Sequence, residues 1–293
     1  MPGSDFVFFL SAVLVSATPG VEGAAAQDSD TTGATRDTEK GIANAGPLAT
    51  PQPMADRWNA PFGGTFSANF TLASEYNYAG ISNTMGQPAY QYGMGYSTPR
   101  LFEGPPVWIH LYGWSSNVRY PAVGEAFEVD LGASLKTLLL ESRLKLEAGY
   151  VRYFYPGTPV ELGYAYSELS FTAEYDFGPF YVSARIRHSD DFFGQSGQSW
   201  NKRVRAGLPL DFLPLPGNVS MELYGTFGNF WVDNFICDGL PGNEYNYWQF
   251  GLTTLALGLE FHVAYVGTSI SYEGCAYANY CSDRLFFSVT KSF

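Results

Sequence analysis

The final segment of the chain alternates between apolar and polar side chains. Within residues 283–293, one parity carries Leu285, Phe287, Val289 and the terminal Phe293, whereas the other parity is mostly polar. A period of two is that of a β-strand with one apolar and one polar face. About ten residues are enough to cross a bilayer at a tilt. The pattern predicts the last strand of an outer-membrane barrel, and the alternative is the edge strand of a soluble sandwich.

The same alternation recurs through the body of the chain and predicts about twelve strands. An even number is expected of a bacterial barrel whose two ends lie on the same side of the membrane. In the first segment, Tyr76 and Tyr78 suit an aromatic girdle at the membrane interface. The predicted strands are 65–78, 88–97, 106–115, 126–136, 140–154, 166–177, 180–189, 200–208, 219–227, 247–255, 257–266 and the final segment.

The connections between these segments alternate in length. Tight turns are expected near residues 177–179 and 255–257. Starting from a periplasmic N-terminus, the long connections all fall outside the cell, as in bacterial barrels. The fold class is therefore predicted to be all-β, a transmembrane antiparallel up-and-down barrel. The long connections are expected at 80–87, 116–124, 155–165, 190–198, 228–245 and 267–283.

The composition supports a sheet that is apolar on one face only. Charged residues make up 15% of the 293 positions and aromatic residues 17%, against roughly 25% charged residues in an average soluble domain. The mean hydropathy is nevertheless −0.09, and no run of about 20 apolar residues follows the N-terminus. The net charge of −12 argues against a nucleic-acid partner, which would favour a basic face.

The N-terminus is predicted to direct export. Residues 6–17 form a short apolar run, and Ala24-Ala25-Ala26 supplies a small-residue cleavage site, which places cleavage between Ala26 and Gln27. The absence of Lys and Arg from residues 1–5 makes this signal atypical. The predicted domains are a signal peptide (1–26), a flexible periplasmic segment (27–64) and the outer-membrane barrel (65–293).

Four adjacent predicted strands carry charge on the parity that should face the lumen. Basic side chains two residues apart on neighbouring strands would form a ladder on one wall, with acidic side chains beside it. Such a transverse field selects solutes in a pore, but paired Arg and Glu can also simply fill a narrow barrel. Both interpretations stay open. The predicted pore-lining residues are Arg143, Lys145, Glu147, Glu168, Glu174, Arg185, Arg187, Arg203 and Arg205.

The cysteines predict a disulfide rather than a metal site. The three cysteines show no metal-ligand spacing and the three histidines are dispersed, so neither a metal nor a cofactor is expected. Cys275 and Cys281 share one predicted outer loop, and a disulfide is permitted after export. Cys237 is then the odd thiol, while the rival pairing joins Cys237 to Cys281.

A catalytic role is not predicted. His188-Ser189-Asp190 contains the residue types of a hydrolase triad. Consecutive residues of a strand point to opposite faces, so these three cannot form a relay. His262 falls on a polar parity, where it is expected to fill the lumen. The protein is therefore predicted not to be an enzyme.

Several segments, kept in order along the chain, resemble the TorF family of Gram-negative porins. The resemblance implies a location in the outer-membrane lipid and a barrel whose terminal Phe293 is read by the barrel-assembly machinery. Family members often carry Arg where Asn77 and Ala79 stand here, so selectivity placed at that loop is not carried over. The segments are LASEYNYAGISNT (72–84), PAYQYG (88–93), YGWSSNV (112–118), VRYFYPG (151–157), SDDFFG (189–194) and CSDRLFFSVTKSF (281–293).

Together these features predict a porin-like channel for the passive diffusion of small hydrophilic solutes. The alternative is a closed barrel of the outer membrane with a structural or surface-interaction role carried by its extracellular loops.

Overall fold

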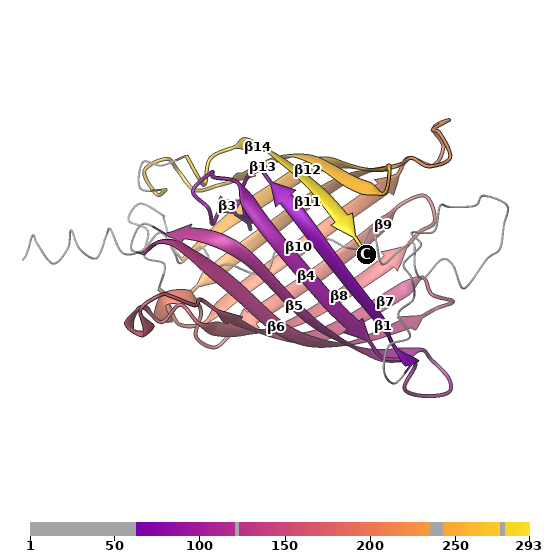
Figure 1. Cartoon of the computed structure of the whole chain (residues 1–293), viewed down its shortest axis with the longest axis horizontal. Coiled ribbons are helices and arrows are strands. Elements are labelled where there is room, and N and C mark those ends of the chain that lie inside the picture. The colour runs from indigo at the N-terminus through magenta and orange to yellow at the C-terminus, as the bar shows by residue number, and fades with distance from the viewer. Residues whose placement is uncertain (1–62, 121–122, 235–242, 276–278) are drawn as a thin grey trace, which may run out of the picture.

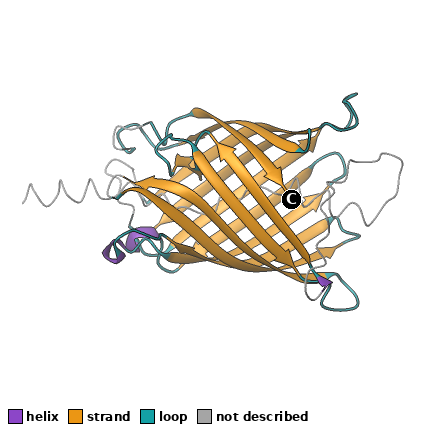
Figure 2. Ribbon diagram, in the orientation of Figure 1, coloured by secondary structure: helices purple, strands orange, loops and turns teal. Residues whose placement is uncertain are grey.

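Twelve antiparallel strands close into a barrel in the computed structural model (Figures 1 and 2). The structure describes residues 63–120, 123–234, 243–275 and 279–293. The barrel strands are β1 (Thr65–Ala73), β4 (Ala89–Ser97), β5 (Val107–Tyr120), β6 (Gly124–Leu139), β7 (Leu144–Phe154), β8 (Tyr166–Asp176), β9 (Tyr181–Ser189), β10 (Ser199–Pro209), β11 (Ser220–Val232), β12 (Glu244–Ala256), β13 (Leu259–Thr268) and β14 (Arg284–Ser292).

Each strand pairs with its neighbour in the chain, and the last strand pairs with the first. Leu72 lies opposite Val289 of β14 on one side and opposite Tyr90 of β4 on the other. Phe293 extends this seam, because its backbone N–H donates to the carbonyl oxygen of Ala68 at 2.8 Å. The predicted fold class, an up-and-down barrel of twelve strands, is confirmed.

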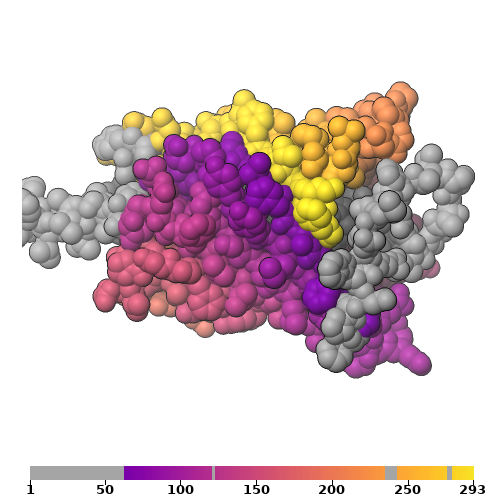
Figure 3. Space-filling model, in the orientation of Figure 1, coloured from indigo at the N-terminus to yellow at the C-terminus, as the bar shows by residue number. Residues whose placement is uncertain are grey.

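The outer wall of the barrel is apolar. Leu131 and Phe227, for example, are 55% and 56% exposed. A contiguous apolar surface of this extent is a liability in water but is required in lipid, where closure leaves no unpaired strand edge. Figure 3 shows one flank, where the strands from the two ends of the chain lie side by side. The outward apolar residues include Leu72, Tyr92, Met94, Leu111, Phe127, Leu131, Leu169, Val204, Phe227, Phe250, Leu285 and Phe287.

The lumen is filled partly by tyrosine rings that lie over glycines. Tyr247 lies opposite Gly228, and Tyr112 lies opposite Gly132, on neighbouring strands. A Cβ at either glycine would overlap the facing ring. Inward-facing glycines of these strands are therefore places where a large aromatic side chain crosses closely over the backbone.

The prediction of a first strand that continues to residue 78 is wrong. Strand β1 ends at Ala73, and the chain turns into the lumen as a small hairpin, β2 (Asn77–Tyr78) and β3 (Ile81–Ser82). Ala79 and Gly80 form its turn with positive φ values of 45° and 86°. We call residues 74–88 the plug hairpin. Alternation continues through this segment, but the ladder with β4 ends where Ala73 pairs with Ala89, and the Ser74 amide makes one further bond to the wall, to the carbonyl oxygen of Phe287 at 2.8 Å.

Tyr76 and Tyr78 therefore do not form an aromatic girdle. Their side chains are 0% and 4% exposed inside the barrel, whereas girdle tyrosines would face lipid at the interface. A Tyr hydroxyl buried in protein needs a hydrogen-bond partner, and the Tyr76 hydroxyl donates to Glu128 at 3.0 Å. The two tyrosines serve the interior of the barrel rather than its membrane contact.

The connection expected at 116–124 is mostly strand. Strand β5 runs to Tyr120 and β6 starts at Gly124, with Arg119 opposite Glu125 in the ladder. Opposite charges at such a position stabilise the pairing, which extends the hairpin farther than alternation alone predicts. At the other end of the barrel, residues 98–106 and 210–219 form long connections, so the expected alternation of long outer and short periplasmic connections is not strict.

The orientation in the membrane follows from the ends of the barrel. Strand β1 begins and β14 ends at the same end, which we take as the periplasmic end because bacterial barrels place both there. The plug hairpin then lies at the outer end. The predicted signal peptide (1–26), its cleavage site at Ala26 and Gln27, nearly all of segment 27–64, and Cys237 lie outside the described residues. Within the described ranges, no helix is long and apolar enough to cross a membrane.

Candidate functional site: the barrel lumen

Most of the charged residues predicted to line the pore lie on the inward parity of their strands. On β9 and β10 the inward positions are buried, apart from the partly exposed Arg203 and Pro209, and the intervening positions are exposed or partly exposed. The inward set comprises Lys145 and Glu147 on β7, Glu168 and Glu174 on β8, Arg185 and Arg187 on β9, and Arg203 and Arg205 on β10.

The prediction that Arg143 lines the lumen is wrong. Arg143 is exposed in the turn between β6 and β7, and strand β7 begins only at Leu144. Leu140, Glu141 and Ser142 adopt positive φ values in this turn. The turn therefore takes up the residues that alternation assigns to the start of the strand, and Arg143 lies at the periplasmic rim.

Arg187 belongs to a buried network in the outer half of the lumen. Its guanidinium lies 3.4 Å from the Glu168 carboxylate, which also accepts a hydrogen bond from the Tyr153 hydroxyl at 2.7 Å. Arg187 and Glu168 are 7% and 1% exposed. A buried charge needs such a partner. The Arg187–Glu168 pair therefore agrees with the second interpretation of the charged strands, in which paired Arg and Glu side chains fill the lumen.

Arg205 is held by a second network, in the inner half of the lumen. Glu222 on β11 lies 3.2 Å from its guanidinium and also accepts a hydrogen bond from Tyr181 at 2.8 Å. The guanidinium stacks on the Tyr224 ring at 3.8 Å, a favourable cation–π distance. Glu222 was not among the predicted residues, although it shares the inward parity of Tyr224, which could have revealed it.

Arg185 and Arg203 face a cavity of about 110 Å³ inside the barrel. They lie directly opposite each other in the β9–β10 ladder. The plug hairpin, through residues 77–80, borders the outer side of this cavity, and Thr253, Glu260 and Thr290 extend it toward the periplasmic ends of their strands. His262 also lines it and bonds the Tyr224 hydroxyl, in accord with its predicted place in the lumen.

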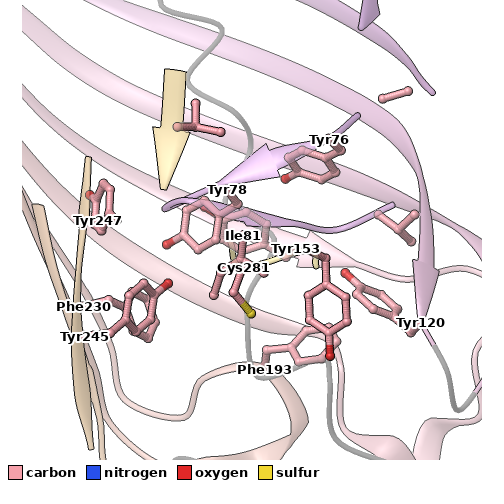
Figure 4. Close-up of a cluster of buried hydrophobic side chains, with 14 of the residues drawn as sticks. Tyr76, Tyr78, Ile81, Tyr120, Tyr153, Phe193, Phe230, Tyr245, Tyr247 and Cys281 are labelled. Carbon is pink, nitrogen blue, oxygen red and sulfur yellow. The ribbon is translucent and has the colours of Figure 1, made fainter. Parts of the chain in front are cut away.

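Above the cavity, aromatic side chains fill the outer half of the lumen. Figure 4 shows Tyr76, Tyr78 and Ile81 of the plug hairpin among rings from the barrel wall and the outer loops. Tyr153 stacks on Tyr166 with ring centroids 4.2 Å apart. We call this group the aromatic cluster; its other members include Tyr120, Tyr155, Tyr164, Phe192, Phe193, Phe230, Tyr245 and Tyr247.

An ion pair holds the plug hairpin against the first residue of the last strand. The Arg284 guanidinium lies 2.7 Å from the Glu75 carboxylate, and its Nη1 donates to the carbonyl oxygen of Gly80 at 2.8 Å. The side chains of Glu75 and Arg284 are 4% and 16% exposed. Sequence reasoning placed Arg284 on the polar face of its strand but could not identify a partner 209 residues away.

Two further buried acids lie beneath the hairpin. Glu128 and Asp130 of β6 are both 0% exposed, and Glu128 accepts the hydrogen bond from Tyr76. Alternation places both on the polar parity of β6, so their inward direction could be predicted. They were not among the predicted pore-lining residues, and nothing in the sequence indicated their burial beneath the hairpin.

The structure joins Cys275 and Cys281 in a disulfide, with their Cα atoms 6.0 Å apart. The bridge lies in the loop before β14, whose Cys281 carbonyl oxygen accepts a hydrogen bond from Thr268 at 2.9 Å. The same loop contacts the plug hairpin, because the Ser82 amide donates to the Tyr280 carbonyl oxygen at 2.9 Å. The bridged loop therefore supports the hairpin from the outer side.

Digestion of the unreduced protein is expected to yield linked peptides that contain Cys275 and Cys281, because one short loop brings the two thiols together. Mass spectrometry of the peptides, with alkylation before reduction, measures this linkage. Alkylation of Cys237 in the same sample is the internal control. Alkylated Cys275, or a peptide that links Cys237 to Cys281, would contradict this pairing.

The described residues contain no group of three His, Cys, Asp or Glu side chains that could hold a metal ion. His188 lies on the outward parity of β9 and bonds Asp190 at 3.0 Å, while Ser189 is buried on the inward parity. The three residues therefore do not form a relay.

Comparison with known proteins gives a family and no close relative. The model of a bacterial protein family of unknown function, Gcw_chp, matches residues 58–293. No curated protein matches the chain. Among solved structures, LpxR from Salmonella typhimurium is 10% identical with a TM-score of 0.45, over 78% of this chain and 99% of that one. An outer membrane channel from Pseudomonas putida F1 is 13% identical with a TM-score of 0.41, over 78% and 94%.

These structural similarities are weak, and the location of the protein follows from its own geometry. A closed barrel with an apolar outer wall and a polar lumen is the structure by which β-strands cross the bacterial outer membrane. The family match spans the whole barrel. The chain therefore belongs to the bacterial family Gcw_chp, whose function is unknown, and forms a twelve-stranded barrel of the outer membrane.

Proposed function

We propose that this protein is a channel for the passive diffusion of small hydrophilic solutes across the outer membrane. The observation that carries the proposal is the cavity of about 110 Å³, lined by Arg185, Arg203, Arg205 and Glu260 together with uncharged polar side chains. A barrel with a purely structural role would gain stability by filling this space with apolar side chains. The retained polar space supports a path for solutes.

The plug hairpin and the aromatic cluster close the outer half of the lumen in this conformation. For a channel, the plug hairpin is then the gate, and the Glu75–Arg284 ion pair is the contact that keeps it inside. The aromatic cluster is also the observation that favours the alternative, a permanently closed barrel that acts through its outer loops. The two functions differ in whether the hairpin leaves the lumen.

The proposal includes membership of the TorF family of porins and the absence of catalysis. The ordered TorF-like segments are spread along the barrel from its first to its last strand, and one of them, 72–84, forms the end of β1 and most of the plug hairpin. The segment with the residue types of a hydrolase triad, His188-Ser189-Asp190, places His188 and Ser189 on opposite faces of β9. Both features support a transport role over an enzymatic one.

Liposome swelling tests the channel directly. Liposomes that contain the purified barrel are expected to swell in isotonic glycerol faster than liposomes without protein, and more slowly in a larger neutral solute such as sucrose. Swelling no faster than that of protein-free liposomes, for the wild-type protein and for a variant with the plug hairpin removed, would overturn the proposal in favour of the closed barrel.

Deletion of Phe293 is expected to lower the amount of protein in the outer membrane severalfold. Phe293 closes the β1–β14 seam through Ala68 and exposes its ring on the lipid side, where the proposed partner, the barrel-assembly machinery, would read it. Immunoblots of outer-membrane and periplasmic fractions, with heat-modifiable mobility, measure the effect. The conservative variant Phe293→Tyr is the control, and an unchanged yield of the deletion variant would refute this role.

A further inference from the structure

The outer wall of the barrel carries two cations on strands β7 and β10 that face lipid. Arg152 of β7 lies between the buried Val151 and Tyr153, and Lys202 of β10 shares the parity of the exposed Val204. Both side chains therefore point away from the lumen, and both are protonated at neutral pH. A cation that faces lipid is costly at the midplane of the bilayer and costs much less at the interface with water.

The strand register places Arg152 and Lys202 at a similar depth. Rows of directly opposite residues climb toward the outer end of the barrel as the strand number increases. The row of Asn69, in the middle of β1, reaches Tyr166, the outermost residue of β8. From Arg152 to Lys202, the pairing steps two residues toward the periplasm on β8 and two more on β9. These steps offset the climb that strand tilt produces.

Aromatic side chains mark this depth as the outer interface of the membrane. Trp200 follows Lys202 on the outward face of β10 and lies opposite Trp231 of β11. Tyr150 precedes Arg152 on the outward face of β7. Trp and Tyr are enriched where barrel strands pass from hydrocarbon into headgroups. Arg152 and Lys202 therefore reach the headgroups of the outer leaflet.

The partners of both cations within the protein are uncharged. The Arg152 guanidinium donates to the Ser167 hydroxyl at 3.2 Å and lies 5.7 Å from the centroid of the Phe154 ring. Lys202 is exposed and lies opposite Asn229. No ion pair among the described residues includes either side chain. Both are therefore open to an anionic group on the lipid side.

We propose that the outward face of β7–β10 binds an outer-leaflet lipid whose headgroup carries two phosphate groups, one at Arg152 and one at Lys202. The two residues are three strand spacings apart, at least about 14 Å, so a single phosphate cannot contact both. Arginine binds phosphate through paired hydrogen bonds, and lysine binds it as a compact point charge. Between the two cations, the exposed Leu169, Phe171 and Ile186 offer an apolar surface for the acyl chains. The site lies outside the lumen, so the inference is independent of conduction.

Native mass spectrometry of the purified, detergent-solubilised protein tests the site. The probes are lipid A with two phosphate groups, the same lipid A with one, and phosphatidylcholine, which is zwitterionic. Retention of one molecule of the bisphosphorylated lipid A is expected, at concentrations where the monophosphorylated form is retained severalfold less. Equal retention of all three lipids would show binding by acyl chains alone and would overturn the site.

The double variant Arg152→Gln, Lys202→Gln is expected to lower retention of bisphosphorylated lipid A by at least about tenfold, because both phosphate contacts lose their charge. The control Lys291→Gln removes a cation on the outward parity of β14 near the periplasmic end and should leave retention unchanged. Heat-modifiable mobility checks folding, and the single variants replace the double variant if that one does not fold.

A loss of retention that is confined to the Arg152 and Lys202 variants would support the site. Retention that persists in the double variant, or that falls equally in Lys291→Gln, would overturn it, since the lipid would then bind elsewhere on the wall or through total charge. Equal retention of the two forms of lipid A would overturn the requirement for two phosphate groups.

Discussion

Replacing Arg284 with alanine is expected to turn brief openings of the channel into long ones in planar bilayers. Arg284 binds the plug hairpin at two points, the Glu75 carboxylate and the Gly80 carbonyl oxygen. Each hydrogen bond to a charged group contributes about 1.5–3 kcal/mol, and 1.4 kcal/mol is a factor of ten in an equilibrium. The open fraction is therefore expected to rise by at least about tenfold.

The matched control is Lys291→Ala on the same strand. Lys291 is partly exposed near the periplasmic end and bonds the carbonyl oxygen of Gly258 at 3.1 Å, far from the plug hairpin. The Lys291→Ala substitution removes one positive charge from β14 without releasing the plug hairpin. Recordings of this variant should therefore resemble those of the wild type. Equal open fractions for Arg284→Ala and Lys291→Ala would show that the ion pair does not hold the gate.

The double variant Arg185→Glu, Arg203→Glu is expected to shift the reversal potential in a salt gradient toward cations. Both side chains line the cavity through which the proposed ion path runs, and the change converts two positive charges to two negative ones. The shift should be larger at low salt than at high salt, because mobile ions screen the field. Assembly should persist, because these side chains face away from lipid.

The control for this experiment is the double variant Arg119→Glu, Arg143→Glu. It changes the formal charge by the same amount at two exposed positions outside the cavity. If the reversal potential moves equally in both double variants, the selectivity comes from the charge of the whole protein. If it moves in neither, Arg185 and Arg203 lie off the ion path.

The fold was largely predictable because lipid enforces strict alternation. Strands such as β4 and β9 have one parity that faces lipid. A shift in register by one residue would make their polar side chains point toward the lipid. Their predicted bounds, 88–97 and 180–189, agree within a residue with Ala89–Ser97 and Tyr181–Ser189. The predicted strand bounds were wrong where the geometry of a turn or hairpin determines the end of a strand. Examples are the turn that contains Arg143 and the extended β5–β6 hairpin.

The sequence predicted which side chains face the lumen, but not which of these side chains form ion pairs with each other. Parity showed that Arg187 and Arg205 face inward, but Glu168 and Glu222 become their partners only through the register of neighbouring strands and side-chain reach. The plug hairpin escaped prediction because its alternation continues that of β1. Its inward turn depends on Arg284, at the far end of the chain, and no local pattern encodes that contact.

Single-channel recording of the wild type beside a hairpin-shortened variant measures whether the plug hairpin closes an otherwise open lumen. The variant replaces residues 75–87 with Asn-Gly, a turn suited to a tight connection between antiparallel strands, which is feasible because Ala73 already pairs with Ala89. We expect brief conductance steps for the wild type and a steady, larger conductance for the variant. A correctly folded variant that gives no steps would show that the lumen is closed without the hairpin and would contradict the channel.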